Sequence, residues 1–137
     1  MNSGIELTHD PIVIPPLELP TREIGSVLEF QGLVRELEQG APLTGLFYEA
    51  YEPLVRKQLG YHIDELQKQH PVAAVLFIHR LGWVPVGEAS LFIRVLSPHR
   101  VEGLLFLAEM VVRLKKDVPI WKLVKPVVQR PVPDGRA

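Results

Sequence analysis

The chain of 137 residues contains no cysteine. Disulfides, thiolate metal sites and cysteine nucleophiles are therefore excluded, and any sulfur in its chemistry must arrive on another molecule. Long apolar runs are also missing, because the longest covers about eight residues (71–78) against the ~20 that span a bilayer. No basic segment followed by an apolar one marks the N-terminus, so we expect no secretory signal, no membrane contact and a cytoplasmic protein.

Several motifs that identify common active sites are absent as well. There is no glycine-rich phosphate loop, no nucleophile elbow and no HExxH pattern. The five histidines show no short metal-ligand spacing; His62 and His70, eight positions apart on a predicted helix, share a face only loosely. The sequence therefore predicts neither a metal site nor a bound cofactor.

Composition indicates one globular domain, since 47% of residues are hydrophobic and 23% are charged. Prolines cluster at the two ends, where they disfavour regular structure. We therefore expect a single domain at residues 1–125 that begins with an extended, proline-rich lead-in (1–21). A proline-rich tail (126–137) follows it.

Charge is distributed unevenly along the chain, although the net charge is only −1. Residues 1–70 carry 5 basic and 11 acidic side chains, whereas residues 71–137 carry 10 and 5. This asymmetry suggests that the second half holds an anionic ligand, while a nucleic-acid binder would be basic overall. The alternative interpretation is that both sets of charges are scattered over solvated surface.

Apolar periodicity predicts an α+β domain with two layers and a mainly antiparallel sheet. The expected order is β-β-α-β-β-α-β, with a further short edge strand at residues 5–8. Residues 36–42 are expected to form a polar loop, and turn signals occur at residues 81–82 and 85–87. Strands are predicted at 26–34, 43–51, 72–79, 88–96 and 120–124, and helices at 53–69 and 98–116. The stripes expected to face the core are Val55, Leu59, Ile63 and Leu66 in the first helix, and Val101, Leu104, Leu105, Ala108, Val111 and Val112 in the second.

The start of the second predicted helix is a candidate anion site. Ser97 is a preferred N-cap and Pro98 a preferred first helical residue, which places Arg100 in the first turn beside His99. A cation there opposes the helix dipole, whereas free backbone N–H groups with Arg and His suit an anion. The alternative is that Arg100 pairs with a nearby carboxylate.

Two lysines near the end of the same helix are candidates for chemistry. Lys115 and Lys116 lie in the last turn of the predicted helix, where positive charge is stabilising. A purely structural role would therefore explain both residues. Lys122 lies between Trp121 and Leu123 in an apolar segment, so we expect it to be partly desolvated. A desolvated lysine near other cations serves as a nucleophile or proton carrier near neutral pH. Arg35, at the end of the first strong strand, is a weaker candidate.

Five segments together resemble the large, catalytic subunit of molybdopterin synthase. They follow one another over residues 26–122, and their joint order makes the resemblance specific. The segments are Phe30-Gln31-Gly32-Leu33-Val34-Arg35, Tyr48-Glu49-Ala50-Tyr51-Glu52-Pro53, His79-Arg80-Leu81-Gly82 with Gly87-Glu88-Ala89-Ser90, Ser97-Pro98-His99-Arg100, and Leu114-Lys115 through Pro119-Ile120-Trp121-Lys122.

The resemblance implies a reaction and an assembly. Family members insert two sulfurs into a cyclic pyranopterin monophosphate to form the dithiolene of molybdopterin. Each sulfur comes from the thiocarboxylated C-terminal Gly-Gly of a small ubiquitin-like subunit. The family assembly is a dimer of large subunits with one small subunit at each end, and each active site borrows residues across the dimer interface. The implied fold is an α+β fold of the hammerhead type.

The resemblance also assigns residues. Lys115 matches the central catalytic lysine and Lys122 the second active-site lysine. Both are also expected to bind substrate. The family usually carries a basic and then an acidic residue after the tryptophan–lysine pair, where this chain has Leu123 and Val124. The other expected substrate-binding residues are Arg35, His99 and Arg100, and the expected pocket-lining residues are Leu33, Val34, Leu123 and Val124.

Two further hypotheses remain open. One is a non-catalytic relative that binds a ubiquitin-like tail or an anion without turnover, which the departure at Leu123 and Val124 keeps in consideration. The other is a structural domain that binds a metabolite and has no ubiquitin-like partner.

Overall fold

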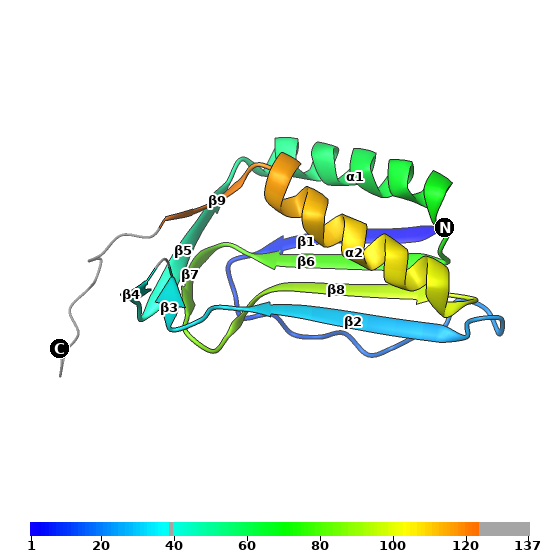
Figure 1. Cartoon of the computed structure of the whole chain (residues 1–137), viewed down its shortest axis with the longest axis horizontal. Coiled ribbons are helices and arrows are strands. Elements are labelled where there is room, and N and C mark those ends of the chain that lie inside the picture. Colours follow the sequence, from blue (N-terminus) through cyan, green and yellow to red (C-terminus); the bar gives the residue numbers. More distant parts are fainter. Residues whose placement is uncertain (39, 124–137) are drawn as a thin grey trace.

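The computed structural model describes residues 1–38 and 40–123; the predicted tail at 126–137 lies outside them. Two helices lie on one face of a four-stranded sheet, and the short strands gather at one end of the molecule (Figure 1). The large sheet contains β1 (Asn2–Thr8), β6 (Ala74–Arg80), β8 (Ala89–Ser97) and β2 (Ser26–Leu33), in that spatial order. β1 runs parallel to β6 and the other pairs are antiparallel, so the predicted α+β class with a mainly antiparallel sheet is confirmed.

Two smaller sheets differ from the prediction. β5 (Gly45–Ala50) pairs with β7 (Gly82–Pro85) on one side and with β9 (Ile120–Leu123) on the other. The turn signal at Gly82 marks the left-handed first residue of β7 (φ 83°) rather than the end of regular structure. Within the expected polar loop, β3 (Leu37–Glu38) and β4 (Ala41–Pro42) form a two-residue ladder. Such short strands lack an apolar period, because neither is long enough to show one.

Helix α1 (Glu52–Gln69) buries the stripe that its sequence predicts. Its four apolar positions recur at helical spacing and belong to the main hydrophobic core. Strands β6 and β8 contribute Val75, Phe77, Ile93 and Val95 to this core. This burial orders the long helix far more than its intrinsic propensity does. The four buried residues are Val55, Leu59, Ile63 and Leu66, each at most 1% exposed.

Helix α2 (Arg100–Asp117) turns a different face inward from the one predicted. Its buried residues are Gly103, Phe106, Met110 and Leu114. The helix carries two apolar stripes. The sheet contacts the stripe where Gly103 permits close approach to the side chains of Ser97 in β8 and Leu28 in β2. The predicted stripe faces outward instead, with Val101 55%, Leu104 52%, Leu105 45% and Val112 53% exposed; Ala108 is exposed and Val111 only half-buried.

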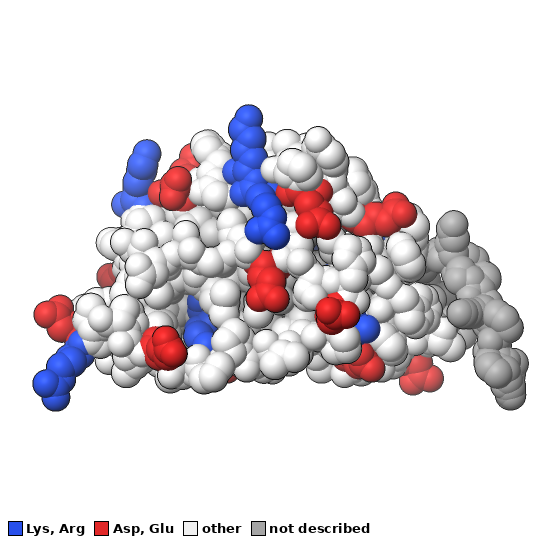
Figure 2. Space-filling model, turned by 180° about the vertical axis from the view of Figure 1, so that it is seen from behind, with Lys and Arg blue, Asp and Glu red and all other residues white. Residues whose placement is uncertain are grey.

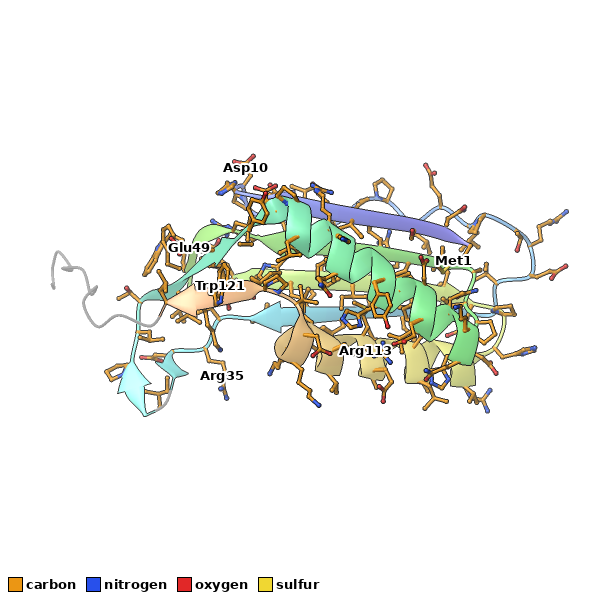
Figure 3. All side chains as sticks on the ribbon, turned by 90° about the horizontal axis from the view of Figure 1, so that it is seen from above. Met1, Asp10, Arg35, Glu49, Arg113 and Trp121 are labelled. Carbon is orange, nitrogen blue, oxygen red and sulfur yellow. The ribbon has the colours of Figure 1, made fainter. Side chains whose placement is uncertain are left out.

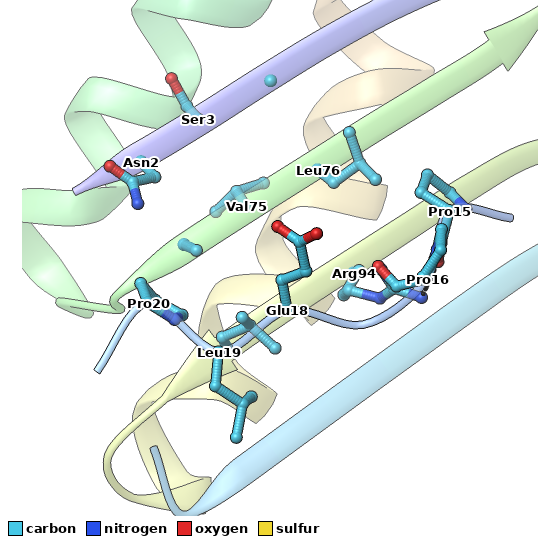
Figure 4. A pocket seen from close by; sticks show the side chains of 13 residues that line it. Asn2, Ser3, Pro15, Pro16, Glu18, Leu19, Pro20, Val75, Leu76 and Arg94 are labelled. Carbon is cyan, nitrogen blue, oxygen red and sulfur yellow. Dashed lines mark hydrogen bonds between the residues drawn. The ribbon is translucent and has the colours of Figure 1, made fainter. Parts of the chain in front are cut away.

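The opposite face of the sheet is covered by residues 9–25, which we call the strap. Figure 4 shows Pro15, Pro16 and Glu18 of the strap lying over β6 and β8, close to Arg94. The Arg94 guanidinium donates through Nη2 to the carbonyl of Pro15 (2.9 Å) and through Nε to Glu29 (2.7 Å). Proline carbonyls accept such bonds although proline has no N–H to donate. The strap explains why both faces of β8 are buried.

Charged side chains on the rear face are interspersed with uncharged ones (Figure 2). Between the helices, Arg113 donates to both Nδ1 of His62 (3.1 Å) and the carboxylate of Glu65. That bond from Arg113 is the main cause of the lowered pKa of Glu65. None of the helices in the described part of the chain has the length and apolar content to cross a membrane.

Candidate active site

A cavity of about 590 Å³ opens where the end of α2 meets β2, β5, β6 and β9. Its lining includes Arg35, Lys115 and Lys122, which come from three separate segments of the chain. Figure 3 places Arg35 and Trp121, the neighbour of Lys122, at the end of the molecule where α2 ends. Three of the predicted cationic residues therefore converge on one site.

Buried neighbouring residues position two of these cations, Arg35 and Lys115. Arg35 follows Val34, which is 3% exposed, and the backbone of Val34 exchanges hydrogen bonds with Glu88 (3.1 Å) and Gly87 (2.8 Å). Lys115 follows the buried Leu114 in the last turn of α2. The cations thus extend from elements whose own positions the core determines.

The prediction that Lys122 is partly desolvated is wrong. Its side chain is exposed in this chain, as are those of Arg35 and Lys115. The apolar neighbours Trp121 and Leu123 point to the other face of β9, because side chains alternate along a strand. Only a covering partner or ligand would remove water from these three cations.

His99 and Arg100 lie at the opposite end of α2 and do not line this cavity. Fifteen residues separate Arg100 from Lys115, which is about 22 Å along a helix axis. The predicted cap is also wrong: His99 is the N-cap and Arg100 the first helical residue. Ser97 stays in β8 because it pairs with Ser26, and its hydroxyl donates to the carbonyl of His99 (2.7 Å).

The four residues predicted to line the pocket do not all lie at this cavity. Leu33 (54% exposed) and the buried Val34 line the cavity. Leu123 pairs with Phe47 at the end of β9 and does not line it. Val124 lies outside the described residues.

Two cavity residues, His79 and Tyr48, carried no predicted role. The Tyr48 ring meets that of His79 edge-on, with 5.1 Å between centroids. His79 is 5% exposed, and its burial lowers its pKa to about 4. The only sequence signal was a histidine at the end of an apolar strand, inside one of the five matching segments.

Among residues 1–38 and 40–123, no group of three or more His, Asp or Glu side chains is arranged to hold a metal ion. The polar side chains that line the cavity include the three cations, the hydroxyls of Tyr48 and Ser90, and His79.

The sequence and the fold have counterparts in known proteins. A family model described as MoaE protein matches residues 7–117. The chain belongs to the MoaE protein family. The molybdopterin synthase catalytic subunit of Thermoplasma volcanium is 33% identical over 126 residues, covering 89% of this chain and 90% of that one.

Solved structures agree with this assignment. Molybdopterin synthase from Staphylococcus aureus superposes with a TM-score of 0.76 at 31% identity, covering 85% of this chain and 87% of that one. A complex of subunits 1 and 2 of molybdopterin-converting factor from Helicobacter pylori shares the fold, with a TM-score of 0.64 at 22% identity over 88% and 82% of the two chains. The predicted family, the fold class and the enzyme class, a sulfurtransferase of molybdenum cofactor biosynthesis, are confirmed by this membership.

Proposed function

We propose that this cavity converts cyclic pyranopterin monophosphate to molybdopterin, with sulfur from the thiocarboxylated C-terminus of a small ubiquitin-like subunit. The observation that carries the proposal is the convergence of Arg35, Lys115 and Lys122 on one cavity. The phosphate and the thiocarboxylate are both anions, and bringing them within a few ångströms costs on the order of a few kcal/mol in a partly dry site. Three cations offset that repulsion.

Each cation has a proposed task. Arg35 binds the phosphate, because a guanidinium matches its oxygens with two parallel hydrogen bonds. Lys115 acts at the reacting carbon as proton carrier or transient covalent partner, and Lys122 stabilises the charge that develops there. At each of two neighbouring carbons the thiocarboxylate sulfur bonds to carbon as a carbon–oxygen bond breaks, and the oxygen leaves as water or stays on the phosphate. Water then cleaves the acyl–sulfur bond, so each tail leaves as a carboxylate.

His99 and Arg100 join the site only through a second copy of the chain. The outward stripe of α2 (Val101, Leu104, Leu105, Ala108 and Val112) is the surface that would pair. Two copies related by a twofold axis would pack these stripes antiparallel. The first turn of one α2 would then meet the last turn of the other, which brings His99 and Arg100 of the second copy to Lys115. This arrangement supports the predicted homodimer, and the heterotetramer once two small subunits bind.

The small subunit is supported by the Helicobacter pylori structure, which is a complex of two subunits. The lack of cysteine in this chain agrees with sulfur delivered by a partner. The tail must reach the three cations from outside, and their solvent exposure leaves that approach open.

The test is to mix the chain with precursor and thiocarboxylated small subunit, and to measure molybdopterin formed. Lys115→Ala should lower turnover at least about a hundredfold, because a proton carrier contributes that much. Lys116→Ala is the matched control, since Lys116 is exposed on the same helix and does not line the cavity. If Lys115→Ala turns over normally, Lys115 does not act at the reacting carbon. If wild type forms no molybdopterin, the chain binds the tail or an anion without catalysis.

Mixing two inactive variants tests the shared site. Lys115→Ala and Arg100→Ala chains form mixed dimers with one intact site each, if Arg100 acts across the interface. Random exchange in an equal mixture should restore about a quarter of wild-type activity. No recovery would show that Arg100 does not act in trans.

A further inference from the structure

His79 brings a different kind of group to a cavity that is rich in cations. The side chains of Arg35, Lys115 and Lys122 can only donate hydrogen bonds. Cations alone hold an anion, but they do not distinguish one phosphate ester from another. A buried acceptor of fixed direction would make that distinction.

Hydrogen bonding determines the tautomer of His79. Its Nδ1 lies 2.8 Å from the backbone carbonyl oxygen of Arg80. A carbonyl oxygen can only accept, so Nδ1 carries the proton and donates. In the neutral ring Nε2 is then a lone-pair acceptor.

Neighbouring rings hold the imidazole in place. Phe77 lies nearly parallel to it, with 6.5 Å between centroids and 29° between planes, and Tyr48 meets it edge-on. Burial favours the uncharged ring, as the pKa of about 4 indicates. At neutral pH His79 therefore adds an acceptor to the cavity without adding a fourth positive charge.

We propose that Nε2 of His79 accepts a hydrogen bond from an N–H group of the heterocycle bound in the cavity, and so selects a nitrogen heterocycle among phosphate-bearing ligands. This inference rests on the proposed function, which makes that ligand the cyclic pyranopterin monophosphate. A site that pairs a buried polar group with its substrate rejects analogues lacking the matching group far more strongly than an apolar pocket does.

Binding can be separated from catalysis by using the chain in complex with a small subunit that ends in an ordinary carboxylate. Calorimetric titration with the precursor should show His79→Phe weakening affinity about tenfold or more, because the ligand N–H is left unpaired. His79→Gln keeps an acceptor oxygen and should stay within about threefold. His62→Gln is the matched control, because His62 is 6% exposed but does not line the cavity.

Inorganic phosphate is the second ligand in the titration. All four proteins should bind it equally, since Arg35, Lys115 and Lys122 are unchanged. Precursor affinity in His79→Phe equal to wild type would overturn the inference. Equal weakening for phosphate and precursor would also overturn it, because His79 would then act only on the anion site or the fold.

Nitrogen NMR of the wild-type complex tests the hydrogen bond to His79 Nε2 directly, even if His79→Phe does not fold. The His79 Nε2 resonance should move on addition of precursor and stay in place with phosphate, while Nδ1 remains protonated. An Nε2 resonance that does not respond to precursor overturns the inference. If wild type converts precursor and His79 fails these tests, only this inference falls; if wild type neither binds nor converts precursor, the proposed function falls as well.

Discussion

Lys122 lies directly opposite Tyr48 in the antiparallel pairing of β9 with β5. Opposed residues in such a ladder place their side chains on the same face of the sheet. Tyr48 in turn contacts His79 of β6, so Lys122, Tyr48 and His79 line the cavity together.

Replacing Lys122 by Ala should lower kcat about a hundredfold while leaving the protein folded, because its exposed ammonium contributes charge rather than packing. The measurement is turnover with precursor and thiocarboxylated partner, beside a thermal melt. Lys68→Ala, an exposed lysine in the last turn of α1, is the control. Unchanged kcat in Lys122→Ala would remove Lys122 from the reaction.

Introducing a charge on the outward stripe of α2 should separate the proposed dimer. Leu104 is 52% exposed, so Leu104→Glu should cost the monomer little, whereas a buried carboxylate at an interface is strongly disfavoured. Sedimentation should show a folded monomer with little activity. Leu54→Glu, at a 39% exposed position on α1, should leave the assembly intact. A dimeric Leu104→Glu chain would place the interface elsewhere.

Arg94 should be the main attachment of the strap. Arg94→Met keeps an unbranched side chain beside the Phe92 ring but loses the cation–π contact with it and the bonds to Glu29 and to the strap carbonyls. We expect a loss of about 2–3 kcal/mol in the free energy of unfolding, measured with denaturant, and faster proteolysis within residues 9–25. Glu29→Gln, which still accepts from Arg94, should lose about 1 kcal/mol. Equal proteolysis of Arg94→Met and wild type would show that other contacts hold the strap.

Two helical glycines should respond oppositely to alanine. At Gly60 a Cβ meets nothing within 4 Å, so Gly60→Ala should stabilise the protein by about 1 kcal/mol through helix propensity. At Gly103 a Cβ would come within 2.7 Å of Ser97 Oγ and 3.2 Å of Leu28 Cδ1. Gly103→Ala should therefore destabilise by about 1–3 kcal/mol, despite the same gain in propensity. Thermal or denaturant unfolding of the two variants checks the sign of each change.

His79 should make the fold sensitive to mild acid. Its pKa is about 4 in the folded chain and 6.5 in the reference state, so between these values the unfolded chain binds a proton that the folded chain does not. Stability should fall as pH decreases from 6.5 to 4, by up to about 3 kcal/mol, and this contribution should level off below pH 4. His79→Gln should reduce the loss over that window. An unchanged pH profile in His79→Gln would assign the acid sensitivity to other groups.

Several elements were predictable from sequence because their signals are local. The helical spacing of apolar residues in α1 predicts a helix, and the alternation in residues 88–96 predicts a strand. Arg35, Lys115 and Lys122 were candidates from their local context, and the family resemblance assigned their expected roles. The structure brings the three residues to one cavity. The position of the strap and the existence of β7 could not be predicted, because proline-rich and very short segments show no periodic pattern of apolar residues.

The sequence by itself determined the order of the two helices and the longer strands, the absence of cysteine chemistry and the identity of the cationic residues, since each of these is a property of neighbouring or matching positions. Only the tertiary structure decided which of the two apolar stripes of α2 faces the sheet, that His79 reaches the cavity, and that His99 and Arg100 do not reach it within one chain. The physical reason is that burial depends on contacts between residues far apart along the chain. In α2, the deciding contact is the close approach that Gly103 allows to Ser97 and Leu28.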